Sequence, residues 1–317
     1  MDIISLICKK TGSMNERNDY WMRERECESR FAACEPCFMI TTPQQDWLMY
    51  KSREEFIVGT NITAIAAGLS GFVILNDVQM NNHHHILGTG TRNQVESFVR
   101  LFSDKMRRFQ NTVGNGSLKN WKIRIDETTD LQQFRNRTAY IDRNPYVVRL
   151  DSTPSGYPWS SAGLFFNGNL WMMEKGDPFQ SLSIDARRII CRSKIIDLPN
   201  TYRVFRGMIL RSSFVDYHRT ESMFNSANQY FSLLYRRGEA DVEIARMLGE
   251  GIQLPNEEVF QIVAGWFEGR KIRDLNLQER LVAARKMKKE LACANKQIVQ
   301  ILRLPAEDVD KMFPRAQ

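Results

Sequence analysis

The segment between residues 37 and 144 limits the fold of this chain most, because short β-rich runs alternate there with longer segments of helical periodicity. A strand shows apolar runs or period-two alternation, whereas an amphipathic helix repeats its apolar residues every three or four positions. The predicted order is strand, helix, strand, strand, helix, strand, helix, at residues 37–42, 52–69, 72–80, 83–87, 92–110, 121–125 and about 130–144. This order predicts an α+β fold in which helices pack on one sheet.

Local signals set the ends of some of these helices. Ser52 can cap the first helix, with Glu55 three residues later as the capping-box partner. Pro145 is expected to end the last helix at Asn144, because proline lacks the N–H donor that a helix needs and clashes with the preceding turn.

Composition changes along the chain and predicts three parts. Residues 1–33 are polar and charged, and are expected to form a loosely specified N-terminal extension. The α+β domain is expected to cover residues 34–175, with a Gly/Pro/Ser-rich patch at 151–168 near its end. Helix-forming residues dominate after about residue 180, so residues 180–317 are expected to form an all-α C-terminal domain.

The charge of the chain suits a polyanionic partner. The net charge is +7 and the isoelectric point about 9.1. Two groups of basic residues stand out, at 100–108 and 270–289. Each is either a DNA-contacting surface or a solvated helix face. The candidate DNA contacts are Arg107, Arg108, Lys122, Arg124 and Arg137.

Nothing in the sequence predicts a membrane protein. No apolar run reaches the roughly 18 residues that a spanning helix needs. Residues 1–10 contain a short apolar run without a preceding basic region, so no signal peptide is expected and the cytoplasm is the expected location. Cys34 and Cys37 have metal or redox spacing, but no second pair follows, and reduced thiols beside a strand are the simpler interpretation.

Three of the four histidines are consecutive, at His83, His84 and His85. Alternate side chains of a strand share a face, so His83 and His85 point one way and His84 the other. Two imidazoles at this spacing can share one metal ion if a third ligand comes from elsewhere. The alternative is a surface histidine run without a role.

A second candidate element is the helix that ends before Pro145. Arg137, Tyr140 and Asn144 lie on one polar stripe of that helix, at spacings of three and four residues. A tyrosine on such a stripe is either surface decoration or a nucleophile with a metal-binding amide one turn away.

Three motifs in order resemble those of HUH single-tyrosine transposases, especially the REP-associated tyrosine transposase branch. They are Met-Asn-Asn-His-His-His-Ile-Leu at 80–87, Tyr-Ile-Asp-Arg-Asn-Pro at 140–145 and Tyr-Pro-Trp-Ser-Ser at 157–161. The resemblance covers about residues 35–165 and implies a ferredoxin-like or RRM-like antiparallel sheet with helices, the HUH nuclease domain. His84 and Asn81 stand where the family usually has a hydrophobic residue and a proline.

The resemblance implies a role for four residues. His83 and His85 would bind the metal, Asn144 would be its third ligand, and Tyr140 would be the nucleophile. Nitrogen and amide oxygen ligands suit Mg²⁺ or Mn²⁺. A phenol has a pKa of about 10 and needs help to lose its proton, from the metal or from a cation such as Arg137.

The implied activity is nicking and rejoining of single-stranded or hairpin DNA through a 5′-phosphotyrosine intermediate, by a homodimer. Two alternatives remain open: a domesticated DNA-binding regulator of the same ancestry with weak catalysis, and a metal-dependent phosphodiesterase that does not use Tyr140.

The end of the chain predicts a possible helix-turn-helix. A basic amphipathic helix is expected at 278–292, with Leu281, Val282 and Met287 toward the interior. Residues 295–302 and 304–309 then predict helix, turn, helix, although the second helix carries acidic residues that fit poorly against phosphates. A plain helical bundle is the alternative.

Overall fold

The computed structural model describes residues 14–44, 48–114, 118, 121–148, 154–194, 197–235, 256–267, 270–291, 293 and 295–313. The chain divides into two compact units. The first contains Met1–Asn144 and Ser152–Arg236, and the second contains Pro145–Asp151 and Arg237–Gln317. We describe each unit by itself.

The first unit is built on a four-stranded antiparallel sheet. Its elements follow the chain as β1 (Cys37–Thr41), α3 (Arg53–Ser70), β2 (Val73–Gln79), β3 (His84–Thr89), α4 (Arg92–Val113) and β4 (Arg124–Thr128). The strand order across the sheet is β2-β3-β1-β4, and every neighbouring pair is antiparallel. The prediction of an α+β fold, with helices on a sheet formed by residues 37–128, is therefore confirmed.

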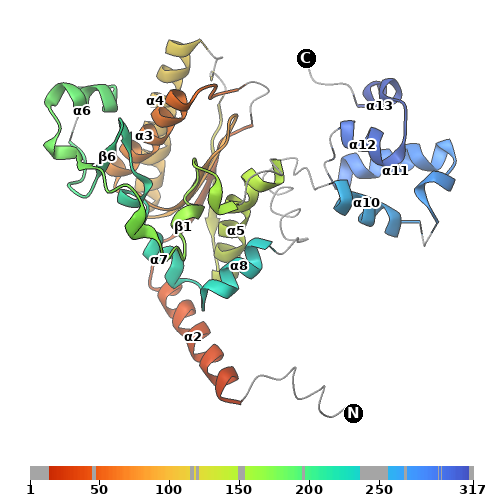
Figure 1. Ribbon diagram of the computed structural model, residues 1–317, viewed down its shortest axis with the longest axis horizontal. Helices are drawn as coiled ribbons and strands as arrows, with labels where there is room; N and C mark the ends of the chain where they lie inside the picture. The colour runs from red at the N-terminus through yellow and green to blue at the C-terminus, as the bar shows by residue number, and fades with distance from the viewer. Residues whose placement is uncertain are drawn as a thin grey trace. The chain divides into compact units, whose positions relative to one another are not determined.

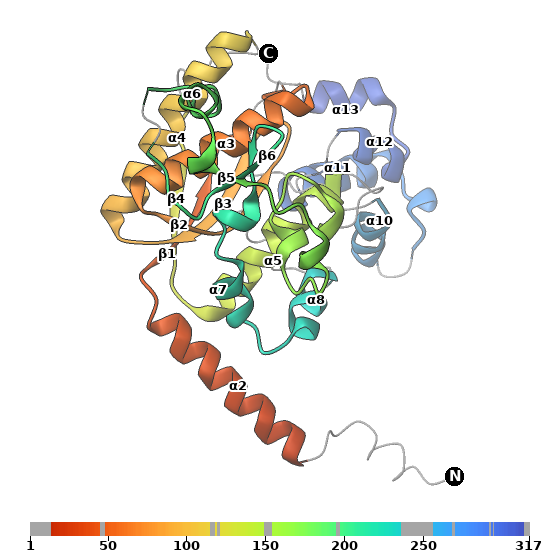
Figure 2. The same cartoon turned by 60° about the vertical axis from the view of Figure 1, so that its left-hand side comes forward.

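Helices cover both faces of this sheet (Figure 1; Figure 2). Helices α3 and α4 pack together on one face, where Phe38 and Ile40 of β1 join Phe98 and Phe102 of α4 in the main core. Helix α5 (Leu131–Val148) lies on the other face, where its Asp142 accepts a hydrogen bond from Asn76 of β2. The face that α5 covers carries the predicted site.

The helix ends follow the predicted chemistry closely. The Ser52 side chain caps the start of α3 by accepting a hydrogen bond from the Glu55 backbone N–H. Gly71 caps the end of α3 with a φ of 70°, which glycine adopts without strain. The Glu55 carboxylate accepts from the Lys51 N–H at 2.8 Å. A complete capping box, Thr91 with Gln94, begins α4 instead.

Helix α5 continues past the expected stop. Pro145 lies inside the helix, which ends at Val148 rather than at Asn144. The prediction of a helix end at this proline was wrong: a proline removes one N–H donor, and neighbouring packing can compensate for that loss. Tyr140 and Asn144 therefore lie on one continuous helix.

The N-terminal region differs from the expected loose extension. Residues Met14–Ala32 form helix α2, which extends beyond the sheet from its junction with β1 (Figure 2). Its second half packs on α5, where the ring of Phe31 lies 5.9 Å from that of Phe134. Local sequence patterns did not predict this helix, because its contacts come from residues far along the chain.

Residues 154–235 belong to the first unit, so the observed division lies near residue 236 rather than at 175–180. Three short strands form a second antiparallel sheet in the order β5-β6-β7: β5 (Asp177–Pro178), β6 (Arg203–Phe205) and β7 (Met208–Ile209). The α-helices here are α6 (Ile184–Cys191), α7 (Tyr217–Ser222) and α8 (Ala227–Tyr235). Short 3₁₀ turns are η1 (Pro154–Gly156), η2 (Ala162–Leu164), η3 (Leu170–Met172), η4 (Phe179–Ser181) and η5 (Arg211–Ser213). Strands thus occur where only helices were expected.

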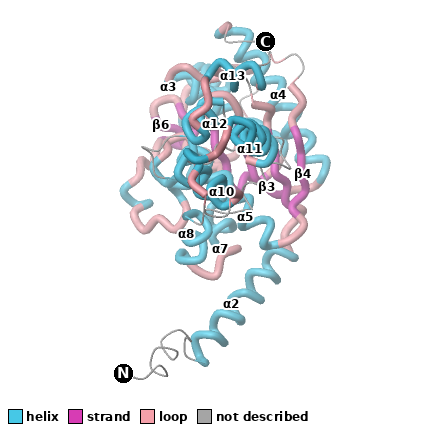
Figure 3. Tube along the Cα trace, turned by 90° about the vertical axis from the view of Figure 1, so that its right-hand side faces the viewer, coloured by secondary structure: helices cyan, strands magenta, loops and turns pink. Residues whose placement is uncertain are grey.

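In the described part of the second unit the regular elements are all helical (Figure 3). They are α10 (Asn256–Gly265), η6 (Ile272–Asp274), α11 (Leu277–Glu290), α12 (Asn295–Leu302) and α13 (Ala306–Met312). Helices α12 and α13 lie where residues 295–302 and 304–309 predicted two helices joined by a turn.

This unit has its own apolar core. Met287, Ile298 and Leu302 are fully buried in it, whereas Val282, expected to face the interior, is 59% exposed. Trp266 and Phe267 are half-buried against this core. Among the residues that the structure describes, no helix combines the length and apolar character needed to cross a bilayer.

Candidate active site

The β2–β3 hairpin brings two of the three consecutive histidines together. The Met80 N–H donates to the His83 carbonyl at 2.9 Å, which closes the turn through Asn81 and Asn82 just before β3. The imidazole rings of His83 and His85 lie 4.9 Å apart, centroid to centroid, at an angle of 83°. Both side chains are buried.

His84 lies on the opposite face, as strand alternation predicts. Its Nε2 is 2.5 Å from the Tyr50 hydroxyl, and its ring lies edge-on to that of Phe102 on α4. Burial holds the pKa of His84 well below its ordinary value, with His83, Arg211 and His85 adding charge repulsion. His84 is thus a neutral core residue.

Helix α5 brings Tyr140 to the same place. The Tyr140 ring lies 5.3 Å from the His85 ring, centroid to centroid, at 76°. Only 3% of Tyr140 and none of His85 is exposed. Three predicted site residues, His83, His85 and Tyr140, are therefore in one cluster that joins the hairpin to α5.

Asn144 follows Tyr140 by one turn on α5, and its side chain is half-buried. Residues four apart on a helix share a face. The fourth predicted residue thus lies on the Tyr140 face of α5.

Strand pairing extends the cluster across the sheet. His85 is paired with Thr41 of β1, and Thr41 in turn with Arg124 of β4. Paired residues of neighbouring strands lie on the same face, so Arg124 shares the face of His85. Its side chain is exposed and is ion-paired with Asp126 at 2.7 Å. Exposed Lys122 precedes the same strand.

The other predicted DNA contacts lie elsewhere. Arg107 and Arg108 are on α4, which covers the face of the sheet opposite to α5. Arg137 is only 6% exposed, and its guanidinium donates to the Asp126 carbonyl at 2.9 Å and the Thr128 hydroxyl at 2.7 Å. Arg137 thus ties α5 to β4 and is poorly placed to contact a DNA phosphate.

An ion pair that the sequence did not predict, between buried Arg135 and half-buried Glu24, fixes the start of α5. Arg135 is 1% exposed, and its guanidinium binds the Glu24 carboxylate of α2 through both terminal nitrogens, at 2.6 and 3.2 Å. Its Nε also donates to the Met223 carbonyl at 2.7 Å. A bidentate contact of this kind fixes orientation as well as position.

A buried carboxyl group fixes the other side of Tyr140. Asp142 accepts hydrogen bonds from the Asn76 amide at 3.0 Å and from the Tyr230 hydroxyl at 2.9 Å. Burial raises the pKa of Asp142 to about 7, although both hydrogen bonds lower it. Asp142 anchors α5 to β2 and α8 close to the tyrosine.

The third predicted motif runs beside β2. The Gln79 N–H donates to the Trp159 carbonyl at 2.8 Å, and Ser160 forms an antiparallel bridge with Val78. The Tyr157 hydroxyl donates to the Gln79 carbonyl at 3.0 Å. The segment 157–161 thus extends the sheet next to the histidine hairpin.

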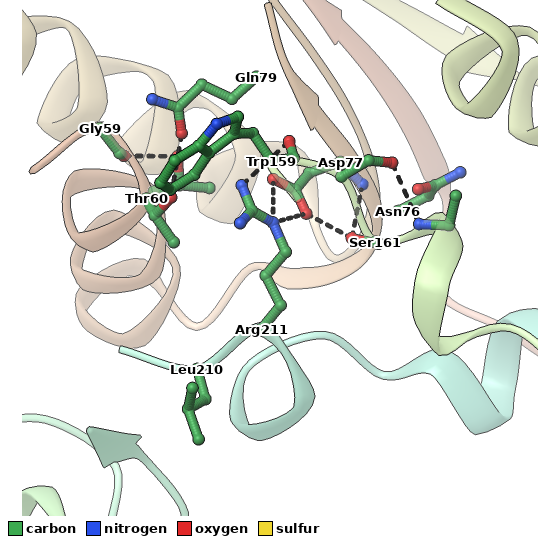
Figure 4. A network of polar contacts seen from close by, with 12 residues as sticks. Gly59, Thr60, Asn76, Asp77, Gln79, Trp159, Ser161, Leu210 and Arg211 are labelled. Carbon is green, nitrogen blue, oxygen red and sulfur yellow. Dashed lines mark hydrogen bonds and ion pairs between the residues drawn. The ribbon is translucent and has the colours of Figure 1, made fainter. Parts of the chain in front are cut away.

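Arg211 holds this motif in place from far along the chain. Its Nε lies 3.1 Å from both carboxylate oxygens of Asp77, and its terminal nitrogen donates to the Trp159 carbonyl at 3.2 Å. The Ser161 hydroxyl also donates to the Asp77 carboxylate (Figure 4). Both members of the ion pair are buried. Sequence reasoning placed residue 211 in a helical domain and missed this contact.

The histidine pair has features of a metal-binding site. His83 Nδ1 lies 2.8 Å from the Asn82 side-chain oxygen, a contact that in the neutral ring places the proton on Nδ1 and leaves Nε2 for a metal ion. The Thr41 hydroxyl lies 3.4 Å from His85 Nδ1. Metal-ligating histidines usually have the second ring nitrogen engaged in this way.

The ligand chemistry fits a hard or borderline divalent ion. Among the described residues, no group of three or more His, Cys, Asp or Glu side chains is arranged to hold a metal ion. The set that the motif resemblance implies is His83, His85 and the Asn144 amide, with water or phosphate completing the shell, and Mg²⁺ or Mn²⁺ can accept such ligands.

The Cys34–Cys37 pair has the properties of ordinary thiols. All five cysteines that the structure describes are free. Burial raises the pKa of Cys37 to about 11 and also raises that of Cys34. Neither is poised as a thiolate, which agrees with the simpler interpretation of this motif.

Comparisons with family models, with curated proteins and with solved structures found no match to this chain.

Proposed function

We propose that this protein is a single-tyrosine DNA-nicking and DNA-joining enzyme of the HUH type. The observation that carries the proposal is the cluster of His83, His85 and Tyr140, which come from two separate elements and lie ring to ring. Each residue type alone has an ordinary structural explanation. Their meeting in one buried cluster supports a shared chemical role.

The arrangement of the sheet also supports this proposal. The order β1-α3-β2-β3-α4-β4 along the chain, with β4-β1-β3-β2 across the sheet, supports the proposal of a ferredoxin-like HUH domain. His85 then belongs to the central strand β3 and His83 to the turn just before it, whereas Tyr140 belongs to the helix after β4.

The proposed reaction is attack by the Tyr140 hydroxyl oxygen on the phosphorus of a DNA phosphodiester. A new oxygen–phosphorus bond forms and the bond from phosphorus to the 3′ oxygen breaks. The phenolic proton passes to water, and the departing 3′ oxygen takes a proton from water. The products are a 5′-phosphotyrosine link and a free 3′ hydroxyl, which can reverse the step to join strands.

The remaining site residues would prepare this attack. His83, His85 and Asn144 would hold a divalent ion, which when bound neutralises charge on the phosphate and orients it for in-line attack. Arg124, exposed on the same face, would attract the DNA backbone. Because Tyr140 and His85 are buried, a phosphate reaches them only if the site opens.

The proposed substrate is single-stranded or hairpin DNA, and the proposed active form is a homodimer. These two points rest on the motif resemblance, and the net charge of +7 suits a DNA partner. The proposed location, the cytoplasm, rests on the lack of a predicted signal peptide. A catalytically weak regulator of the same ancestry would bind the same DNA without forming a covalent link.

Covalent trapping on labelled hairpin DNA with Mn²⁺ tests the proposal. We expect an adduct that resists denaturation with the wild-type protein and none with Tyr140→Phe. Tyr235→Phe is the matched control, because that side chain is 59% exposed and lies outside the cluster, and it should form adduct normally. Binding without an adduct would favour the regulator. Cleavage that survives Tyr140→Phe would favour a phosphodiesterase that does not use the tyrosine.

A further inference from the structure

The C-terminal unit contains a pocket that the proposed chemistry does not use. Its volume is about 340 Å³, within the size range that takes a small ligand. Phe260 of α10, Ile272 of η6 and Ile301 of α12 contribute its apolar lining. Ile272 and Ile301 are buried, whereas Phe260 is 49% exposed. An aromatic ring that is half open to solvent is available for stacking.

The rest of the lining is strongly basic. No acidic side chain of the described residues lines the pocket. Its four cationic side chains are Arg270, Lys271, Arg273 and Arg303. Arg270 is ion-paired with Glu279, and Arg273 lies 3.6 Å from Asp274. Lys271 and Arg303 form no ion pair within the part of the chain that the structure describes. The pocket therefore combines positive charge with an apolar surface.

We propose that this pocket binds an unpaired nucleotide of single-stranded DNA. The base would lie against the apolar lining beside Phe260, and the flanking phosphates would contact Lys271 and Arg303. Aromatic rings and cations together are the means by which proteins bind single strands, because every base has a face to stack and every link a charge. The choice of DNA rests on the proposed function.

A single strand fits this surface better than a duplex. In a duplex each base is stacked between its neighbours, so it cannot enter a pocket unless it is flipped out. The expected recognition helix, α13, also presents exposed Glu307 and Asp310 and half-buried Asp308, which repel a phosphate backbone. The C-terminal unit would thus bind DNA through the pocket between α10, η6 and α12 rather than by reading a groove with α13.

Fluorescence anisotropy with a labelled single-stranded oligonucleotide and the full-length protein tests this inference. The test variant is Lys271→Gln with Arg303→Asn, because Arg303 has a φ of 52°, a conformation that asparagine tolerates. We expect about a tenfold loss of affinity. The negative slope of log affinity against log salt should become shallower by about 1.4, since each lost phosphate contact removes about 0.7 from its magnitude. A separate Phe260→Ala variant should lose affinity without changing that slope.

Lys311→Gln is the matched control, because Lys311 is an exposed cation of the same unit that does not line the pocket. It should bind as the wild type does. The inference would be overturned if the double variant kept wild-type affinity, or if Lys311→Gln lost as much affinity as the double variant. It would also be overturned if the double variant lost as much affinity for a duplex of the same sequence. Tighter binding of single-stranded RNA or of an acidic peptide than of single-stranded DNA would overturn it as well. Circular dichroism of each variant establishes that it is folded.

This test is separate from that of the proposed function. If no covalent adduct forms but the pocket variants still lose single-strand affinity, the proposed chemistry fails and the pocket inference stands. If the adduct forms and the pocket variants bind single-stranded DNA normally, the proposed chemistry stands and the pocket inference fails. An oligonucleotide carrying 5-iododeoxyuridine gives a second readout, because its photocrosslink should map to the peptide that contains Phe260.

Discussion

The ring of Tyr140 on α5 lies 5.3 Å from the ring of His85 on β3, although these elements are separated along the chain by α4 and β4. The contact joins a helix to the central part of the sheet, and His83 completes the cluster. The position of Tyr140 therefore depends on how α5 is fixed, and the orientation of the histidines depends on the turn before β3.

Asn82→Ala should weaken metal binding about 10- to 100-fold, because it removes the oxygen that orients His83 through Nδ1 at 2.8 Å. Titration calorimetry with Mn²⁺ measures this change. Asn81→Ala is the matched control, because Asn81 is the exposed neighbour in the same turn and its backbone carbonyl, which contacts Met49 and Tyr50, is unchanged. Equal affinities for the two variants would argue against His83 as a ligand.

Arg211→Met should lower the free energy of unfolding by about 3–5 kcal/mol, because it leaves the buried Asp77 carboxylate without its cation. Urea denaturation measures the difference. Arg188→Met is the control: Arg188 and Asp185 form a pair whose side chains are 56% and 88% exposed, and such pairs contribute about 0–1 kcal/mol. A similar small loss in both variants would show that Arg211 does not hold the segment 157–161 against β2.

Asp142 should make stability depend on pH. Its pKa is raised from 3.8 to about 7 in the folded state, chiefly by burial, so the folded state holds a proton that the unfolded state releases between about pH 4 and pH 7. The free energy of unfolding should therefore fall as pH rises through this window, by up to about 1.4 kcal/mol per pH unit, and level off above it.

Urea denaturation of the metal-free protein across this pH range measures the slope. Asp142→Asn should remove it, at some cost in stability because an amide cannot accept from Asn76 and Tyr230 equally well. Asp185→Asn, at an exposed position, should keep the wild-type slope. An unchanged slope in Asp142→Asn would contradict the assignment.

The parts of the fold that were predictable depend on local patterns. Alternation and helical periodicity located β1, β2, β3, α3 and α4, and the cap at Ser52 followed from local sequence. The fourth strand, predicted at residues 121–125, instead covers Arg124–Thr128. Strand alternation also separated His84 from His83 and His85, because the side-chain period of a strand is two.

The features that were missed depend on contacts between distant residues. Arg135 and Arg211 look like ordinary surface cations in the sequence, yet each is buried against a carboxylate from another element, Glu24 or Asp77. Arg137 was expected to face DNA, but the Thr128 hydroxyl and the Asp126 carbonyl hold it. Neither the domain division near residue 236 nor these partners can be read from periodicity.

The most direct test of the account is the identity of the residue that becomes linked to DNA. Wild-type protein would be incubated with hairpin DNA and Mn²⁺, digested with nuclease and protease, and analysed by mass spectrometry. The account predicts a phosphorylated Tyr140, with the phosphate derived from the 5′ end of the cleaved strand and a free 3′ hydroxyl on the other product. Phosphate on any other residue, or cleavage that leaves both DNA ends free, would contradict it.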